Sequence, residues 1–172
     1  MKLWLLDADI IIDFLSLDVF DKLVENHKVF VATTVINEVK SFKREDIKYR
    51  IDFRKQYVVS NLVKEVSASS GEIKKVIHNL PPITHDTIHP GELESLAILV
   101  REEEITFCSC DAAVIRALPF LDLSERGISA EMLLKASGLL KSKLKERHTD
   151  QYFKNNLKIG RENKILYFES NS

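Results

Sequence analysis

Leu3-Trp4-Leu5-Leu6 is a continuous apolar run that ends at the carboxylate of Asp7. A short run that is apolar at every position is typical of a strand buried on both faces, as in a parallel sheet. Residues 28–33 and 105–110 repeat this pattern, and the second of these runs ends at Asp111. The three runs therefore predict buried parallel strands, two of which stop at an aspartate.

Helical patterns lie between these runs. Residues 91–101 place apolar side chains at i, i+3, i+4 and i+7, and residues 129–140 also favour a helix. We expect a fourth strand at residues 120–123. Alternation of strands and helices indicates an α/β fold, a three-layer α/β/α sandwich with a central parallel sheet of four to five strands.

The chain has 172 residues, which corresponds to about one domain. We place this domain at residues 1–140, with a helical, basic insertion at about 40–80 and a basic C-terminal extension at 141–172. Its 25 Lys and Arg nearly balance 26 Asp and Glu, for a net charge of −1. Composition therefore excludes a polycationic protein, and any nucleic-acid surface must be local.

Two features bear on the compartment. No apolar run approaches the ~18 residues of a membrane span, so we expect no membrane association. The cysteines, Cys108 and Cys110, have no second pair with which to form a disulfide framework or a zinc site. We therefore expect a cytoplasmic protein.

Acidic residues recur just after the predicted strands. Asp7 and Asp111 end strands, Glu38 lies in the helix after the second strand, and Glu92 and Glu94 begin another helix. Sites in open α/β sheets lie outside the carboxyl ends of the strands, so these side chains can converge. An aspartate there is also a common helix cap, but several buried carboxylates together repel unless a cation neutralises them. Oxygen ligands favour Mg²⁺ or Mn²⁺.

Strand alternation adds a hydroxyl to this edge. Ser109 and Asp111 point to one side of the strand, and Cys108 and Cys110 point to the other. The Ser109 hydroxyl therefore faces the predicted site, where it can hold a water or a phosphate.

Basic residues cluster within the 40–80 insertion. They are interleaved with aromatic residues, a pattern that suits phosphate contacts and base stacking, although a solvated helix face is an equal alternative. The candidate nucleic-acid contacts are Lys40, Lys43, Arg44, Lys48 and Arg50.

Four segments in order resemble the acidic motifs of PIN domains. They are Leu5-Leu6-Asp7-Ala8-Asp9-Ile10-Ile11-Ile12-Asp13, Thr33-Thr34-Val35-Ile36-Asn37-Glu38-Val39, Pro90-Gly91-Glu92-Leu93-Glu94-Ser95-Leu96-Ala97 and Phe107-Cys108-Ser109-Cys110-Asp111. PIN domains are metal-dependent nucleases, mostly of RNA, and include the VapC-like toxins. The resemblance implies an endoribonuclease whose products carry a 3′-hydroxyl and a 5′-phosphate.

The resemblance also implies roles for residues and partners. It assigns Asp7, Glu38, Glu92 and Asp111 to Mg²⁺ or Mn²⁺, with Ser109 nearby. Glu94 is an additional ligand by similarity to the Glu-x-Glu pair of flap endonucleases, and helical spacing does not choose between it and Glu92. The expected partners are RNA, a cognate antitoxin protein if the chain is a toxin, and a second copy in a homodimer.

Two other interpretations remain open. Asp7-Ala8-Asp9 after an apolar strand also resembles the start of haloacid-dehalogenase-type phosphatases, in which Asp7 would be the nucleophile. A PIN-like module without activity, which binds RNA or a protein through its basic faces, is the other alternative.

Overall fold

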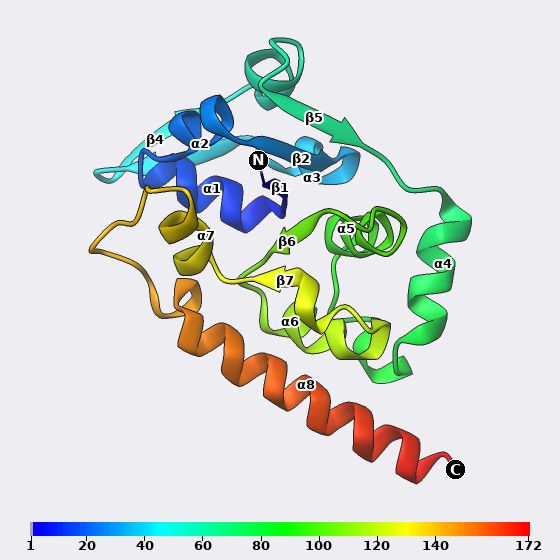
Figure 1. Cartoon of the computed structure of the whole chain (residues 1–172). Coiled ribbons are helices and arrows are strands. Elements are labelled where there is room, and N and C mark those ends of the chain that lie inside the picture. Colours follow the sequence, from blue (N-terminus) through cyan, green and yellow to red (C-terminus); the bar gives the residue numbers. More distant parts are fainter. Residues whose placement is uncertain (1) are drawn as a thin grey trace.

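A five-stranded parallel sheet forms the centre of the computed structural model, which describes residues 2–172 (Figure 1). The spatial order of the strands is β5-β2-β1-β6-β7, and every neighbouring pair is parallel. The strands are β1 (Leu3–Leu6), β2 (Lys28–Ala32), β5 (Val63–Val66), β6 (Thr106–Cys108) and β7 (Gly127–Ile128).

Helices flank both faces of the sheet, which confirms the predicted three-layer α/β/α sandwich (Figure 1). Within residues 2–172, no helix combines the length and the apolar composition that crossing a membrane requires. The helices are α1 (Ala8–Ser16), α2 (Phe20–Asn26), α3 (Thr33–Glu38), α4 (Ser70–Asn79), α5 (Pro90–Arg101), α6 (Ala112–Ala117), α7 (Ala130–Ala136) and α8 (Asp150–Ser170).

Strand β1 occupies the middle of the sheet, between β2 and β6. Trp4, Leu5 and Leu6 are at most 2% exposed, because strands lie on both sides and helices cover both faces. The β1–β6 pairing aligns Leu6 with Cys108, and the Asp7 N–H donates to the Cys108 carbonyl at 3.5 Å. The register therefore places the residues that follow these two strands side by side.

The 40–80 insertion differs from the predicted helical segment. It begins with an antiparallel hairpin of β3 (Ser41–Arg44) and β4 (Ile47–Arg50) and continues through a π-helical turn (η1, Arg54–Val58) and β5. Its one α-helix among the described residues is α4. Phe42 and Tyr49 stack across the hairpin with ring centroids 5.3 Å apart. Such cross-strand aromatic pairs stabilise a hairpin. The many charged residues of this segment obscured the alternation of side chains that would have predicted two strands.

The fourth predicted strand was also misplaced. Residues 118–121 form a 3-10 turn (η3), which contains Pro119 and is followed by Asp122 in the left-handed region with φ 57°. The left-handed backbone at Asp122 interrupts residues 120–123, so this segment cannot continue as an extended strand. The edge strand β7 forms instead at Gly127–Ile128.

The C-terminal extension consists mainly of α8, which runs along α6 and η3 (Figure 1). Gly160 is buried at the crossing with α6, where a Cβ atom would lie 2.5 Å from the carbonyl oxygen of Arg116. The two backbones therefore approach more closely than any residue with a side chain allows.

A buried ion cluster anchors the start of the extension. Asp13, 5% exposed, accepts hydrogen bonds from Lys145 Nζ at 3.1 Å, from Arg147, and from His148 Nε2 at 2.7 Å. Burial alone would raise the pKa of Asp13, but the hydrogen bonds from His148 and Lys145 and the charge of Arg147 lower it to about 2. The extension is thus tied to α1, the helix that follows Asp7.

Replacing Gly160 with alanine tests the packing of α8. Because the added Cβ meets backbone atoms of Arg116 that cannot rotate away, we expect Gly160→Ala to lower the free energy of unfolding by about 1–3 kcal/mol. Thermal unfolding measures the effect, and Lys158→Ala on an exposed position of the same helix is the control. Equal melting temperatures for both variants and the wild type would contradict this packing.

Candidate metal centre

Five carboxylates line one cavity of about 310 Å³ at the carboxyl edge of the sheet. Asp7 follows β1, and Asp111 follows β6, the neighbouring strand. Glu38 ends α3, which follows β2, and Glu92 lies in the first turn of α5, which packs on all three strands. Asp9 of α1 completes the set. Four of the five acids predicted as metal ligands, Asp7, Glu38, Glu92 and Asp111, therefore line the same cavity.

Asp7 caps α1 with only one of its two carboxylate oxygens. Its Oδ1 accepts a hydrogen bond from the Ile10 N–H at 3.0 Å. Its Oδ2 is buried, and within residues 2–172 it has no hydrogen-bond partner. Asp7 is 1% exposed, so this oxygen is also shielded from bulk water. An unpartnered buried carboxylate oxygen is costly, and a bound cation is one group that would satisfy it.

Asp111 likewise caps its helix, α6, with one of its two carboxylate oxygens. Its Oδ1 accepts hydrogen bonds from the N–H groups of Ala113 at 2.8 Å and Val114 at 3.2 Å. The Asp111 N–H in turn donates to Ser109 Oγ at 3.2 Å. Helix capping and a role at the cavity are therefore compatible, since each aspartate commits one oxygen to its helix.

The pKa values of three acids of the cavity, Asp7, Glu38 and Glu92, are raised. Burial raises the pKa of Asp7 to about 7, with contributions from Asp9 and Glu92, against the nearby Ser109 hydroxyl and the Ile10 N–H. Burial also raises the pKa of Glu92 to about 7, and the charges of Asp111, Asp9 and Glu38 add to the rise. At neutral pH the ionised carboxylates are therefore mutually destabilising, and a divalent cation would reverse this effect.

Gly91 provides the space that Glu38 occupies. A Cβ atom at residue 91 would lie 2.9 Å from Oε1 and 3.0 Å from Oε2 of Glu38. Burial raises the pKa of Glu38, and the nearby charge of His89 opposes the rise. The glycine thus lets a carboxylate from α3 approach the first turn of α5, where Glu92 lies.

Glu94 lies outside the cavity lining. It is 5% exposed, and its Oε2 accepts a hydrogen bond from the Thr34 N–H at 2.8 Å. Its Oε1 accepts one from the Ala68 N–H at 3.2 Å. Both oxygens thus tie α5 to the segments after β2 and β5. Of the two glutamates that helical spacing left equivalent, only Glu92 lines the cavity.

Ser109 lies beside Asp7 and is buried, with 3% of its surface exposed. It is not among the residues that line the cavity. Its Oγ accepts a hydrogen bond from the Asp111 N–H, and its hydroxyl lowers the pKa of Asp7, so Ser109 links the two aspartates.

Sequence reasoning missed His89 and Arg147. His89 lines the cavity, and its backbone N–H donates to Glu92 Oε2 at 2.8 Å. His89 precedes Pro90, a common first residue of a helix, and Glu92 is the third residue of that helix. This spacing is that of a capping box, so the sequence could have predicted the hydrogen bond between His89 and Glu92. Arg147 Nη1, in the C-terminal extension, lies 3.7 Å from Asp9 Oδ2. The two residues are far apart in the chain, so no short-range sequence pattern predicts this ion pair.

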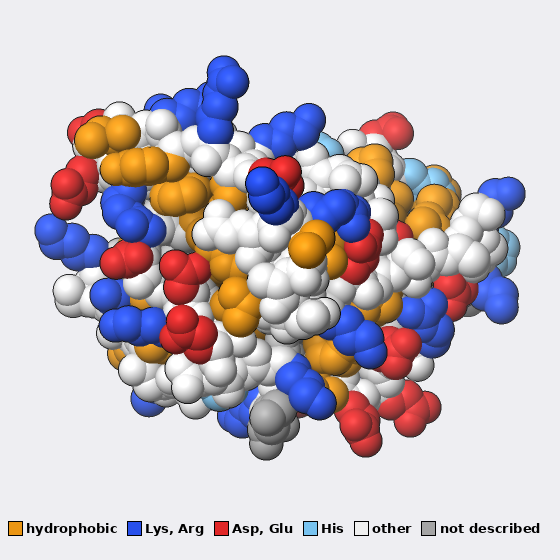
Figure 2. Space-filling view, turned by 90° about the horizontal axis from the view of Figure 1, so that it is seen from above, with side chains coloured by type: hydrophobic (Ala, Val, Ile, Leu, Met, Phe, Trp, Pro, Cys, Tyr) orange, Lys and Arg blue, Asp and Glu red, His pale blue; other side chains and the backbone are white. Residues whose placement is uncertain are grey.

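The predicted basic contacts fall on the β3–β4 hairpin, which begins three residues after Glu38. Lys43 and Lys48 are exposed and directly opposite each other. Lys40 and Arg50 are also exposed, whereas Arg44 turns to the Leu15 carbonyl and to Asp18. On the face seen from the top of Figure 1, Lys and Arg side chains alternate with Asp and Glu side chains (Figure 2).

The donor set suits Mg²⁺ or Mn²⁺, because the cavity offers carboxylate oxygens, and the buried Asp7 Oδ2 lacks a partner. In the conformation described for residues 2–172, no three Asp, Glu, His or Cys side chains are close enough to enclose an ion. The carboxylates therefore ring the cavity as separate groups and do not form a closed ligand cage.

Comparison with known proteins gave no match, either to a family model or to a curated protein. Interpretation of the site therefore rests on its geometry and charge.

Removing the charge of Asp7 tests the electrostatics of the cavity. Because the pKa of Asp7 rises from 3.8 to about 7, the folded protein binds this proton more tightly than the unfolded chain does. Its ionisation therefore costs stability as pH rises from 4 to 8, by about 1–4 kcal/mol in total. Asp7→Asn keeps a side-chain oxygen that can accept the Ile10 N–H. We expect the melting temperature of this variant, relative to that of the wild type, to rise as the pH increases from 4 to 8.

Thermal unfolding at a series of pH values measures this difference. The wild type should also gain melting temperature on addition of Mn²⁺ at pH 8, and Asp7→Asn should gain much less. A difference between the two proteins that does not change with pH would show that Asp7 is not held in a destabilising environment.

Replacing Gly91 with alanine tests the position of Glu38. Alanine is favourable in a helix, but its Cβ would displace the Glu38 carboxylate, so we expect affinity for Mn²⁺ to fall about tenfold with the fold intact. Isothermal titration calorimetry measures the affinity. Gly71→Ala is the matched control, since it changes the second residue of α4, where a Cβ meets only Ser69 Oγ at 3.8 Å. Equal affinities for the two variants would remove Glu38 from the site.

Proposed function

We propose that this chain is a divalent-cation-dependent endoribonuclease that hydrolyses phosphodiester bonds of RNA. The observation that carries the proposal is the buried, unpartnered Oδ2 of Asp7 at the wall of a cavity ringed by further carboxylates. Structural carboxylates are normally fully hydrogen-bonded or exposed to water. Asp7 is instead buried with one oxygen unpartnered, and the pKa values of Asp7 and Glu92 are raised to about 7. Such an arrangement destabilises the protein without a cation, and it favours the binding of one.

Asp7, Glu38, Glu92 and Asp111 are the residues that would hold Mg²⁺ or Mn²⁺. When bound, such a cation lowers the pKa of water and neutralises charge on a phosphodiester under attack. The N–H groups at the starts of α1 and α6 hold the two aspartates in fixed orientation. Glu94 contributes by fixing α5 against the segments after β2 and β5.

The choice of RNA as substrate rests on the resemblance of the acidic motifs to PIN domains and on the position of the hairpin. The cationic face of β3 and β4 carries Lys43, Lys48 and Arg50, and it follows Glu38 directly in the chain. Like charges placed opposite each other in a ladder are unfavourable by themselves, and a phosphate backbone would relieve them.

The nuclease is tested with labelled single-stranded RNA incubated with the purified protein in Mn²⁺ or in EDTA. We expect cleavage only with the cation, and a loss of at least about a hundredfold in rate for Asp7→Asn and for Glu92→Gln. Glu104→Gln, at an exposed position outside the cavity, is the matched control and should cleave normally.

Cleavage that survives both EDTA and Asp7→Asn would contradict the proposed mechanism. RNA retention without cleavage under every condition would favour a binding module instead. Trapping of a covalent aspartyl-phosphate on Asp7 would favour the phosphatase alternative.

A further inference from the structure

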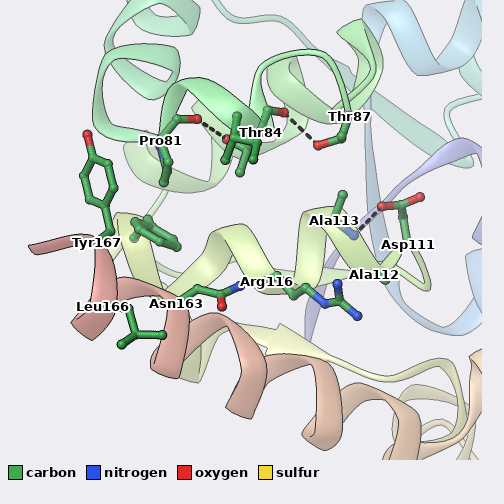
Figure 3. Close-up of a pocket in the computed structure, with 12 residues that line it drawn as sticks. Pro81, Thr84, Thr87, Asp111, Ala112, Ala113, Arg116, Asn163, Leu166 and Tyr167 are labelled. Atoms are coloured by element: carbon green, nitrogen blue, oxygen red, sulfur yellow. Dashed lines mark hydrogen bonds between the residues drawn. The ribbon is translucent and has the colours of Figure 1, made fainter. Parts of the chain in front are cut away.

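A larger cavity of about 600 Å³, drawn in Figure 3, shares Asp111 with the acidic one. It lies between the segment around η2 (Pro82–Thr84), α6 and the last part of α8. Asp111 lines both cavities, so the larger one opens beside the proposed cation site. Its volume lies within the ~300–1,000 Å³ range that is typical of small-molecule sites.

The walls of this cavity are aromatic and aliphatic. Phe120 of η3 and Tyr167 of α8 face it, with ring centroids 6.0 Å apart in an edge-to-face arrangement. Ile83 and Leu166 line it from opposite sides and are 85% and 62% exposed. Large apolar side chains with this exposure indicate a binding surface, and aromatic faces suit the stacking of a planar ring.

Polar groups are placed among these apolar walls. The hydroxyls of Thr84 and Thr87 donate to the carbonyls of Pro81 and Thr84 at 2.7 and 2.8 Å, so their oxygens can still accept a hydrogen bond (Figure 3). Arg116 also lines the cavity, and within residues 2–172 it pairs with no carboxylate.

The Arg116 guanidinium is held in place from one side only. Its Nε donates to Asn156 Oδ1 of α8 at 2.9 Å, which leaves the two terminal nitrogens for another acceptor. The guanidinium and the aromatic walls of the cavity together offer the two contacts that single-stranded nucleic acids use, a phosphate partner and a stacking platform.

We propose that this cavity is a nucleotide subsite, which takes an unpaired nucleobase of the RNA strand beside the bond to be cleaved. The inference rests on the proposed nuclease function and adds the substrate class, an unpaired strand whose base leaves the stack. Tyr167 and Phe120 contact the base, and Arg116 contacts a neighbouring phosphate. The extension thereby contributes directly to substrate binding through α8.

Binding of a short fluorescein-labelled single-stranded RNA, measured by fluorescence anisotropy in EDTA, tests this subsite separately from cleavage. A second probe has the same backbone with abasic residues. Because loss of one stacked base costs about 1–3 kcal/mol, we expect Tyr167→Ala to weaken binding of the first probe about fivefold or more and to leave the abasic probe unaffected. Tyr167→Phe keeps the ring and should bind as the wild type does.

Ile165→Ala is the control, since Ile165 is exposed on the same helix and does not line the cavity. Equal loss for both probes, or no loss for either, would overturn the subsite. If the wild type cleaves RNA and Tyr167→Ala binds normally, only the subsite fails. If base-dependent binding is lost in Tyr167→Ala but the wild type never cleaves, the subsite stands and the nuclease fails.

Discussion

The burial of several neighbouring carboxylates at the carboxyl edge of the sheet is the constraint on which the rest of the structure depends. Asp7, Glu92 and Glu38 all have raised pKa values, with burial as the largest cause and neighbouring carboxylates among the others. A carboxylate oxygen is normally hydrogen-bonded or exposed to water, whereas Asp7 Oδ2 is buried and forms no hydrogen bond within residues 2–172. The fold tolerates this destabilisation because it is confined to one cavity beside a large apolar core. A divalent cation that neutralises these carboxylates would bind favourably and stabilise the folded protein.

The topology explains how distant segments reach this cavity. Neighbouring parallel strands end at the same edge, so β1 and β6 deliver Asp7 and Asp111, and α3 and α5 add Glu38 and Glu92. The extension is attached to α1, the helix that follows Asp7, and it packs on α6, the helix that follows Asp111. Its ion cluster holds α1 through Asp13, and α8 brings new side chains next to the cavity.

Much of this arrangement follows from sequence patterns of short range. The apolar runs that end at Asp7 and Asp111 predicted both the parallel sheet and the acids at its edge, because strand burial and strand termination are local properties. The hairpin was missed because its turn uses Glu45 and Asp46 at φ 50° and 62°, without the glycine that usually marks such a turn. The environment of Glu94 depends on backbone groups far away in the chain, so spacing alone could not distinguish it from Glu92.

Anomalous diffraction from crystals of the protein soaked in Mn²⁺ tests the central claim most directly. The account predicts a manganese peak inside the cavity, within coordination distance of Asp7 and of at least two of Glu38, Glu92 and Asp111. An empty cavity at saturating Mn²⁺, with the carboxylates unmoved and Asp7 Oδ2 still without a partner, would contradict it.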